Sequence, residues 1–186
     1  TFHVAAPRLW WPAGQGEQAL YPLEVTLDGV LHTRRIGLRT LELVTVPDAV
    51  GTTMKLRVNG RDVFAKGANW IPADALPSRI TEAAVRPLLE SARDAHMNMI
   101  RVWGGGNYET EFFYNLCDEL GLMVWQDFMF SCMHYPSTRD FLAEVKQEAT
   151  YQVHRLQHRA CVAVWCGDNE IIGALGWYED AKANRD

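Results

Sequence analysis

The stretch that decides the fold is Val162–Glu170, which reads Val-Ala-Val-Trp-Cys-Gly-Asp-Asn-Glu. Its apolar part, Val162–Trp165, predicts a buried β-strand that leads directly into polar residues. A carboxylate just past the carboxyl end of a parallel strand lies where α/β barrels place their chemistry. Asn169 beside it can hydrogen-bond a polar substrate group. Alternatively, Asp168 and Asn169 cap the next helix, and Glu170 lies in its first turn.

The composition is that of an ordinary globular protein, with 186 residues, 48% of them apolar and 22% charged. A formal net charge of −5 gives no reason to expect nucleic acid or an anionic membrane as a partner. No apolar run approaches the length of a membrane span. The chain begins at Thr1 without Met or a signal-peptide pattern, so we expect a piece of a longer protein whose cellular location stays open.

Cysteine and histidine positions indicate neither a metal site nor a disulfide framework. The cysteine spacings match no zinc motif, so we expect reduced and mostly buried thiols at Cys117, Cys132, Cys161 and Cys166. His154 and His158 lie four residues apart without a third ligand, which favours a helix surface. We therefore expect no metal and no cofactor.

Tryptophan is unusually frequent, with seven residues in the chain. Aromatic faces stack on the C–H faces of sugars, but they also contribute large buried area to a core. Trp125 and Trp165 lie inside apolar strands and are expected in the core. Trp70, Trp103 and Trp177 lie beside strand ends or in loops, where a binding role is at least as well supported.

The first third of the chain is typical of antiparallel β-structure. Two pairs of apolar segments flank turn dipeptides and predict hairpins: Leu20–Leu27 with Leu31–Val44 around Asp28-Gly29, and Met54–Val58 with Asp62–Ala65 around Asn59-Gly60. The second has the residues of a type I′ turn. We interpret residues 1–53 as the end of a β-sandwich.

After Lys66 the pattern changes to alternating strands and helices. The expected strands after the first are Met99–Trp103, Leu122–Trp125 and Val162–Trp165, and the expected helices are Arg79–His96, Glu109–Leu120 and Thr138–His158. Thr81 can cap the first helix, Pro87 should delay or kink it, and Gly121 should close the second. The third should turn an apolar face inward, from Phe141 and Leu142 to Leu156. This order implies parallel strands with right-handed crossovers, as in an open doubly wound sheet or half of a TIM barrel.

Polar or aromatic residues follow every expected strand: Asn69-Trp70, Trp103, Gln126-Asp127 and Asn169-Glu170. Their convergence favours the barrel. No G-x-G-x-x-G follows the first strand, which argues against a nucleotide-binding sheet. We interpret Gly104–Gly106 as a loop that lets a substrate approach closely.

Several motifs together carry a family resemblance. In order they are Leu9-Trp10-Trp11-Pro12 with Leu20-Tyr21, Lys66-Gly67-Ala68-Asn69-Trp70-Ile71-Pro72-Ala73-Asp74, Arg101-Val102-Trp103-Gly104-Gly105-Gly106, Trp125-Gln126-Asp127, and Trp165-Cys166-Gly167-Asp168-Asn169-Glu170. In this order and spacing the chain resembles β-mannosidases of glycoside hydrolase family 2. The resemblance implies that residues 1–53 end an immunoglobulin-like β-sandwich and that residues 54–186 form the N-terminal half of a (β/α)8 TIM barrel.

The resemblance also implies roles for individual residues. Glu170 matches the general acid/base, and Asn169 matches the asparagine that contacts the sugar 2-hydroxyl. Trp103 matches a tryptophan that lines the subsite for the terminal mannose. Arg101 and Asp127 match strand-end positions that shape the pocket.

Two positions after the fourth strand match less closely. Trp177 is assigned to the pocket more loosely, because the correspondence after Glu170 is weaker. Asp168 stands where the family usually has Asn. If its carboxylate lies near Glu170, the added negative charge favours the protonated form that an acid catalyst needs.

The implied activity is the removal of terminal, non-reducing β-D-mannose from oligosaccharides with retention of configuration. Such an enzyme needs a second carboxylate as nucleophile, and no position of this chain matches it, so we expect it beyond residue 186. The isolated chain should then be inactive and, with open sheet edges, poorly stable. The alternatives are another family 2 activity (β-galactosidase, β-glucuronidase or exo-glucosaminidase) or a non-catalytic carbohydrate-binding relative.

Overall fold

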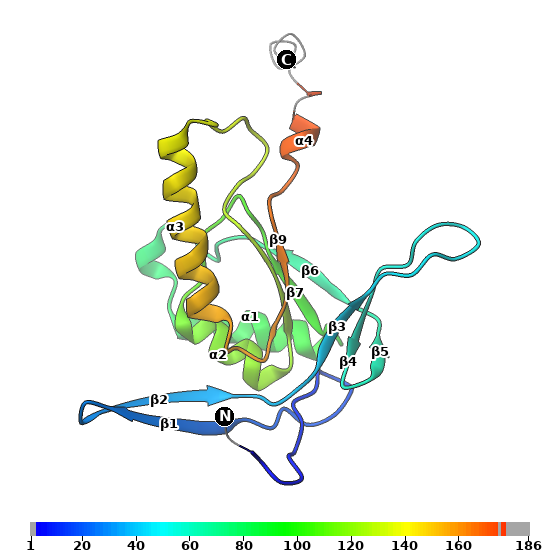
Figure 1. Cartoon of the computed structure of the whole chain (residues 1–186), viewed down its shortest axis with the longest axis vertical. Helices are drawn as coiled ribbons and strands as arrows, with labels where there is room; N and C mark the ends of the chain where they lie inside the picture. The colour runs from blue at the N-terminus through cyan, green and yellow to red at the C-terminus, as the bar shows by residue number, and fades with distance from the viewer. Residues whose placement is uncertain (1–2, 175, 178–186) are drawn as a thin grey trace.

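The computed structural model describes residues 3–174, 176 and 177 and contains three sheets (Figure 1). The strands are β1 Tyr21–Leu27, β2 Val30–Ile36, β3 Leu41–Val44, β4 Lys55–Val58, β5 Arg61–Val63, β6 Gly67–Trp70, β7 Met99–Val102, β8 Met123–Asp127 and β9 Val162–Cys166. The helices are a short 3-10 turn η1 Pro77–Arg79, then α1 Glu82–Asp94, α2 Glu111–Leu120, α3 Arg139–Leu156 and α4 Ile171–Ala174. None of the described helices is long and apolar enough to cross a membrane.

The first sheet is the β1–β2 hairpin, which projects away from the rest of the chain in Figure 1. Its turn residues Asp28 and Gly29 both have positive φ, 49° and 78°. The single strand expected over Leu31–Val44 was wrong, because the structure divides it into β2 and β3. The chain leaves β2 at Gly37, where a Cβ would lie 2.6 Å from the Cβ of Ala160. Close packing on the segment before β9 therefore interrupts the strand.

The second sheet has the order β3-β4-β5 and is antiparallel throughout. The predicted type I′ hairpin is confirmed, since Asn59 and Gly60 both have positive φ, 49° and 77°. Leu56 and Val63 are buried, so one face of this sheet packs against the core. β3 and β4 pair across residue 53, so one sheet joins the two predicted domains. The domain boundary itself and the immunoglobulin-like assignment stay predictions.

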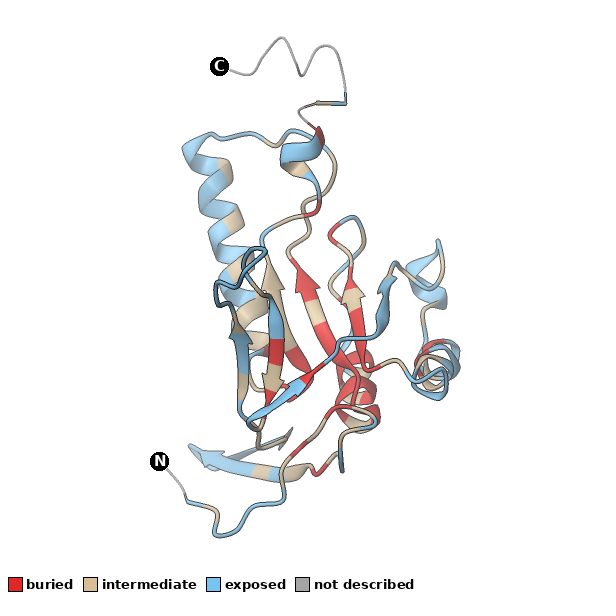
Figure 2. Cartoon of the chain, turned by 90° about the vertical axis from the view of Figure 1, so that its right-hand side faces the viewer, coloured by how far each residue is buried: buried red, intermediate tan, exposed pale blue. Residues whose placement is uncertain are grey.

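The third sheet has the order β6-β7-β8-β9, and every neighbouring pair is parallel. Helices α1, α2 and α3 connect these strands, so the chain contains a partial TIM barrel beside β-rich structure, as the sequence predicted. Figure 2 shows buried residues concentrated on the central strands and on helix turns behind them. Val85, Leu89 and Phe113 from the helices pack there with Val102 and Val124 from the sheet.

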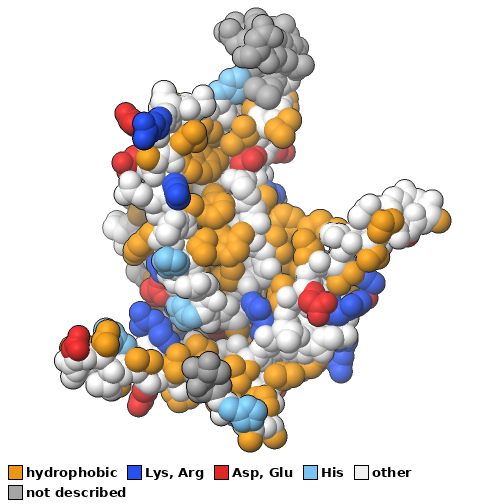
Figure 3. Space-filling view, in the orientation of Figure 1, with side chains coloured by type: hydrophobic (Ala, Val, Ile, Leu, Met, Phe, Trp, Pro, Cys, Tyr) orange, Lys and Arg blue, Asp and Glu red, His pale blue; other side chains and the backbone are white. Residues whose placement is uncertain are grey.

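The opposite face of the parallel sheet would be the barrel interior. Trp125 and Val164 line a hollow there together with Leu43, Met54 and Phe64 from the neighbouring β-structure. Figure 3 shows hydrophobic side chains gathered between α3 and the β3-β4-β5 sheet. Phe64 is 82% exposed, so this apolar face is only partly covered.

The helix ends and the inward face of α3 largely follow the sequence predictions. Thr81 caps α1 by accepting from the Ala84 amide at 3.3 Å, and Gly121 ends α2 with φ 73°. Pro87 lies inside α1 without delaying its start. The predicted inward face of α3 is mostly confirmed: Phe141, Val145, Ala149 and Val153 are half-buried and Leu156 is buried. Leu142 was wrong, since its side chain is 53% exposed. The helix joins the core through its carboxyl-terminal end.

At the amino ends of the strands, a buried network ties the N-terminal segment to the partial barrel. The indole Nε1 of Trp10 donates to the Asp118 carbonyl at 2.8 Å. The Asp118 carboxylate accepts from the Cys161 amide at 2.8 Å and from Arg159 Nη1 at 3.3 Å. Burial raises the pKa of Asp118, although these two donors oppose the shift. Arg39 adds bonds to carbonyls of Ala160 and Val162.

Candidate active site at the carboxyl ends of the parallel strands

Two loops meet at the carboxyl end of the parallel sheet. The loop after β8 and the loop after β9 form a parallel bridge between Ser131 and Asn169. The Cys132 amide donates to the Asn169 carbonyl at 3.0 Å, and the Asn169 amide donates to the Phe130 carbonyl at 2.9 Å. These backbone bonds fix Asn169 and the adjacent Glu170 immediately beyond the end of β9.

Glu170 is exposed and has a left-handed backbone, with φ 60°. A non-glycine residue in this conformation costs on the order of 1–2 kcal/mol and is typical of functional positions. Its Oε2 accepts from Asn169 Nδ2 at 3.2 Å. Cys132 Sγ lies 3.5 Å from the same oxygen. The carboxylate is therefore held on one oxygen and open to solvent.

An ion pair on the two neighbouring strands supports this carboxylate. Arg101 at the end of β7 binds Asp127 at the end of β8 through two bonds, Nε–Oδ1 at 3.2 Å and Nη2–Oδ2 at 2.8 Å. Asp127 is fully buried and also accepts from the Gly104 amide at 3.0 Å. With both oxygens bound, Asp127 serves to hold Arg101 and is unsuited to act as a nucleophile.

Arg101 also orients the side chain of Asn169. Its Nη2 donates to Asn169 Oδ1 at 2.9 Å. A guanidinium can only donate, so the oxygen of the Asn169 amide must face Arg101 and its nitrogen must face Glu170. The contacts Asp127–Arg101–Asn169–Glu170 thus link the end of β8, the end of β7 and the loop after β9.

Asp168 and Asn169 have different roles. Asp168 Oδ1 accepts from the Ile171 amide at 3.1 Å, which is the helix cap considered for this stretch. The Asn169 side chain instead joins Arg101 and Glu170. The capping interpretation therefore holds for Asp168 and fails for Asn169. One oxygen of the Asp168 carboxylate therefore caps the first turn of α4.

Trp103 lies one residue past the end of β7, where its amide donates to the Trp70 carbonyl at 3.0 Å. Its indole covers Gly105 so closely that a Cβ there would lie 2.0 Å from the ring. A Cβ on Gly104 would meet the Phe128 and Phe130 carbonyls at 2.7 Å. These two glycines are needed for close contacts within the protein, a different reason from the substrate approach expected from sequence.

Trp177 lies beyond α4 and is 51% exposed. A Cβ added to Gly173 would lie 3.4 Å from the Trp177 ring and 3.8 Å from the Cβ of Glu170. Trp177 and Glu170 thus flank the same glycine, which supports placing this tryptophan near the site. Trp70 is different: its Nε1 donates to the buried Glu109 at 2.8 Å, and its ring packs on Phe113.

Sequence reasoning missed Cys132. The sequence predicts only that Cys132 is one of four reduced thiols, and all four are free in the structure. Only the backbone bridge between the two loops brings Cys132 to Glu170, and no spacing in the sequence indicates that bridge. Within the described residues, no group of three His, Cys, Asp or Glu side chains is arranged to hold a metal ion.

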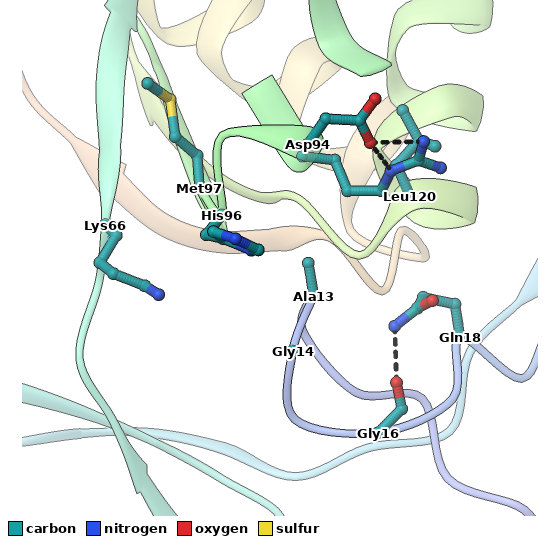
Figure 4. Close-up of a pocket in the computed structure, with 10 residues that line it drawn as sticks. Ala13, Gly14, Gly16, Gln18, Lys66, Asp94, His96, Met97 and Leu120 are labelled. Carbon is teal, nitrogen blue, oxygen red and sulfur yellow. Dashed lines mark hydrogen bonds and ion pairs between the residues drawn. The ribbon is translucent and has the colours of Figure 1, made fainter. Parts of the chain in front are cut away.

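A separate pocket lies at the opposite, amino-terminal end of the sheet (Figure 4). It is lined by Lys66, His96 and Leu120 together with the loop 13–18. Some of its polar side chains bond within the chain: Gln18 Nε2 donates to the Gly16 carbonyl at 2.8 Å, and Arg93 pairs with Asp94 at 2.8 Å. None of the predicted site residues lies there, so the carboxyl ends of the strands remain the candidate site.

The partial barrel, with a carboxylate just past its fourth parallel strand, places the chain in the class of α/β-barrel proteins. No family model matches the chain. Over 179 residues it is 48% identical to the β-mannosidase of Capra hircus, covering 91% of this chain and 20% of that protein. It is 45% identical over 175 residues to β-mannosidase B of Emericella nidulans, covering 91% of this chain and 21% of that protein.

A solved structure agrees with these relatives. The crystal structure of the β-D-mannosidase from Dictyoglomus thermophilum superposes with a TM-score of 0.84 at 48% identity, covering 88% of this chain and 21% of that one. The chain is therefore similar, over most of its length, to a segment of these β-mannosidases. It spans about a fifth of the length of the curated relatives that it matches.

Proposed function

We propose that this chain supplies the acid/base half of the active site of a retaining β-mannosidase. The observation that carries the proposal is the solvent-exposed carboxylate of Glu170, held at a barrel strand end by Asn169 and, through it, by the Arg101–Asp127 pair. Homology to β-mannosidases over 91% of the chain supports mannosides as substrates. The substrate class is terminal, non-reducing β-D-mannose on oligosaccharides.

Glu170 has two tasks in this mechanism. Its protonated carboxyl donates a proton to the glycosidic oxygen as the bond to the sugar breaks. A second carboxylate, about 5–5.5 Å away and supplied by a later part of the barrel, captures the anomeric carbon. Glu170 then accepts a proton from the water that hydrolyses this covalent intermediate.

Neighbouring residues bind and orient the sugar. Asn169 Oδ1 uses one lone pair for Arg101, so its second lone pair can accept from the sugar 2-hydroxyl. Trp103 and Trp177 offer aromatic faces to the sugar ring. Arg101 and Asp127 contribute mainly by fixing Asn169, because their own hydrogen bonds are largely used within the pair.

The test is the substitution Glu170→Gln in the full-length enzyme that carries this chain. Without acid assistance, kcat/KM for mannobiose should fall about 1,000-fold. For dinitrophenyl β-mannoside, whose leaving group needs no proton, kcat/KM should stay near the wild-type value. Steady-state kinetics on the two substrates measures both.

Asp168→Asn is the matched control, since it changes the neighbouring carboxylate while Asn still caps α4. This variant should keep activity on both substrates within about threefold, because side-chain changes away from the reacting atoms have small effects. Equal losses on both substrates in Glu170→Gln would exclude the acid/base role.

A further inference from the structure

Cys132 lies beside the proposed acid/base, although it comes from a different strand loop. Its amide donates to the Asn169 carbonyl at 3.0 Å, so the backbone bridge fixes its position. Its φ of 55° is left-handed, as is that of Glu170, 60°. Both loops that meet at this bridge therefore hold a non-glycine residue in an uncommon backbone conformation, which is typical of functional positions.

The thiol of Cys132 is part of a small hydrogen-bonded cluster. Its Sγ lies 3.5 Å from Glu170 Oε2, and a thiol can donate to a carboxylate. The same sulfur accepts from Asn169 Nδ2 at 3.4 Å and from Ser131 Oγ at 3.1 Å. Accepting two hydrogen bonds leaves the S–H hydrogen directed toward the carboxylate oxygen.

The two oxygens of Glu170 are therefore unequal. Both side-chain hydrogen bonds that the described residues make to this carboxylate, from Asn169 and Cys132, end on Oε2, and none ends on Oε1. An anchored Oε2 leaves Oε1 as the oxygen that can face a glycosidic bond and carry the transferred proton.

We propose that Cys132 is a positioning residue for the acid/base: its thiol holds Oε2 of Glu170 so that Oε1 exchanges protons with substrate and water. The inference rests on the proposed function of Glu170. It adds a residue that acts through the carboxylate and does not itself touch the sugar.

The test compares Cys132→Ala, which removes the donor, with Cys132→Ser, which keeps one. In the full-length enzyme, Cys132→Ala should lower kcat/KM for mannobiose about fivefold, the effect of losing one weak hydrogen bond. For dinitrophenyl β-mannoside the loss should stay below about twofold. Cys132→Ser should recover most of the mannobiose activity. Cys166→Ala is the control, because its half-buried thiol contacts the Asp168 carbonyl and not Glu170.

Equal losses of Cys132→Ala on both substrates, or no recovery in Cys132→Ser, would overturn the positioning role, since a general packing defect does not distinguish leaving groups. Thermal unfolding of each variant separates this outcome from failure to fold. Inactivity of the wild-type enzyme on both mannosides would instead refute the proposed function.

A second readout does not depend on activity. Peptide mapping after iodoacetamide treatment gives the alkylation rate of each thiol. If the Cys132 thiol faces the Glu170 carboxylate, Glu170→Ala removes the group that covers the sulfur and accepts its hydrogen bond, so alkylation of Cys132 should become about threefold faster or more. Alkylation of Cys166 should not change. An unchanged rate at Cys132 would contradict the contact even in an inactive protein.

Discussion

A buried aspartate bound to an arginine lies near each end of the parallel sheet, but the two pairs differ in how far the arginine is exposed and in what else it binds. At the amino ends, Asp118 is 1% exposed and Arg159 is 6% exposed. Arg159 also binds Glu111, and the Asp118 carbonyl accepts a hydrogen bond from the Trp10 indole. This network connects parts of the chain that are more than a hundred residues apart.

At the carboxyl ends, Asp127 is just as buried, but the Arg101 side chain is 28% exposed. Arg101 also donates a hydrogen bond to Asn169, which in turn donates one to the solvent-exposed carboxylate of Glu170. The same kind of pair therefore joins parts of the fold at one end of the sheet and orients the proposed acid/base, Glu170, at the other. This division is typical of α/β barrels.

The largest expected effect on stability is at the amino-end pair. Asp118→Ala leaves the buried Cys161 amide without its acceptor and removes the buried partner of Arg159, which keeps only Asn115 and the more exposed Glu111. Breaking a buried pair by removing one partner costs about 3 kcal/mol. Thermal unfolding should show a midpoint lowered by several degrees, while kcat/KM per folded molecule stays close to wild type.

Asp94→Ala is the control for this substitution. Asp94 pairs with Arg93 on the surface, where its side chain is 66% exposed, so its loss should change stability by no more than about 0.5 kcal/mol. If Asp118→Ala were no more harmful than Asp94→Ala, the amino-end network would not be a stability element.

At the carboxyl end, activity should be more sensitive than stability. Arg101→Lys keeps the charge but cannot reproduce the two-pronged contact with Asp127 while also reaching Asn169. We expect about a tenfold loss of kcat/KM, about 1.4 kcal/mol, and a smaller drop in unfolding temperature than in Asp118→Ala. The reverse order of the two temperature changes would contradict the comparison.

The smallest effect should be a pH dependence at the amino end. Burial alone raises the pKa of Glu111, but hydrogen bonds from Arg155 and Arg159 outweigh it and lower the pKa below the ordinary 4.5. A lowered folded-state pKa stabilises the protein above 4.5, and this contribution is lost as pH falls through the folded value. Glu111→Gln should therefore weaken the decline of unfolding temperature below about pH 5. An identical decline in both proteins would exclude Glu111 as its source.

The sequence predicted the parallel strands, the type I′ hairpin at Asn59-Gly60 and the position of Glu170, because local pattern and turn chemistry determine these features. It did not predict the break at Gly37, which depends on packing against Ala160. Nor did it find Cys132, whose approach to Glu170 depends on a bridge between loops. On α3 it misjudged only Leu142, because periodicity shows which residues share a face but not what covers each of them.

The central claim is that Glu170 acts as acid/base in a retaining mechanism, and azide tests it most directly. In Glu170→Ala of the full-length enzyme, dinitrophenyl β-mannoside still forms the covalent intermediate, but no base remains to activate water. Azide needs no base, so it should accelerate turnover and yield the mannosyl azide with β configuration. No acceleration by azide, or an α-configured product, would contradict the account.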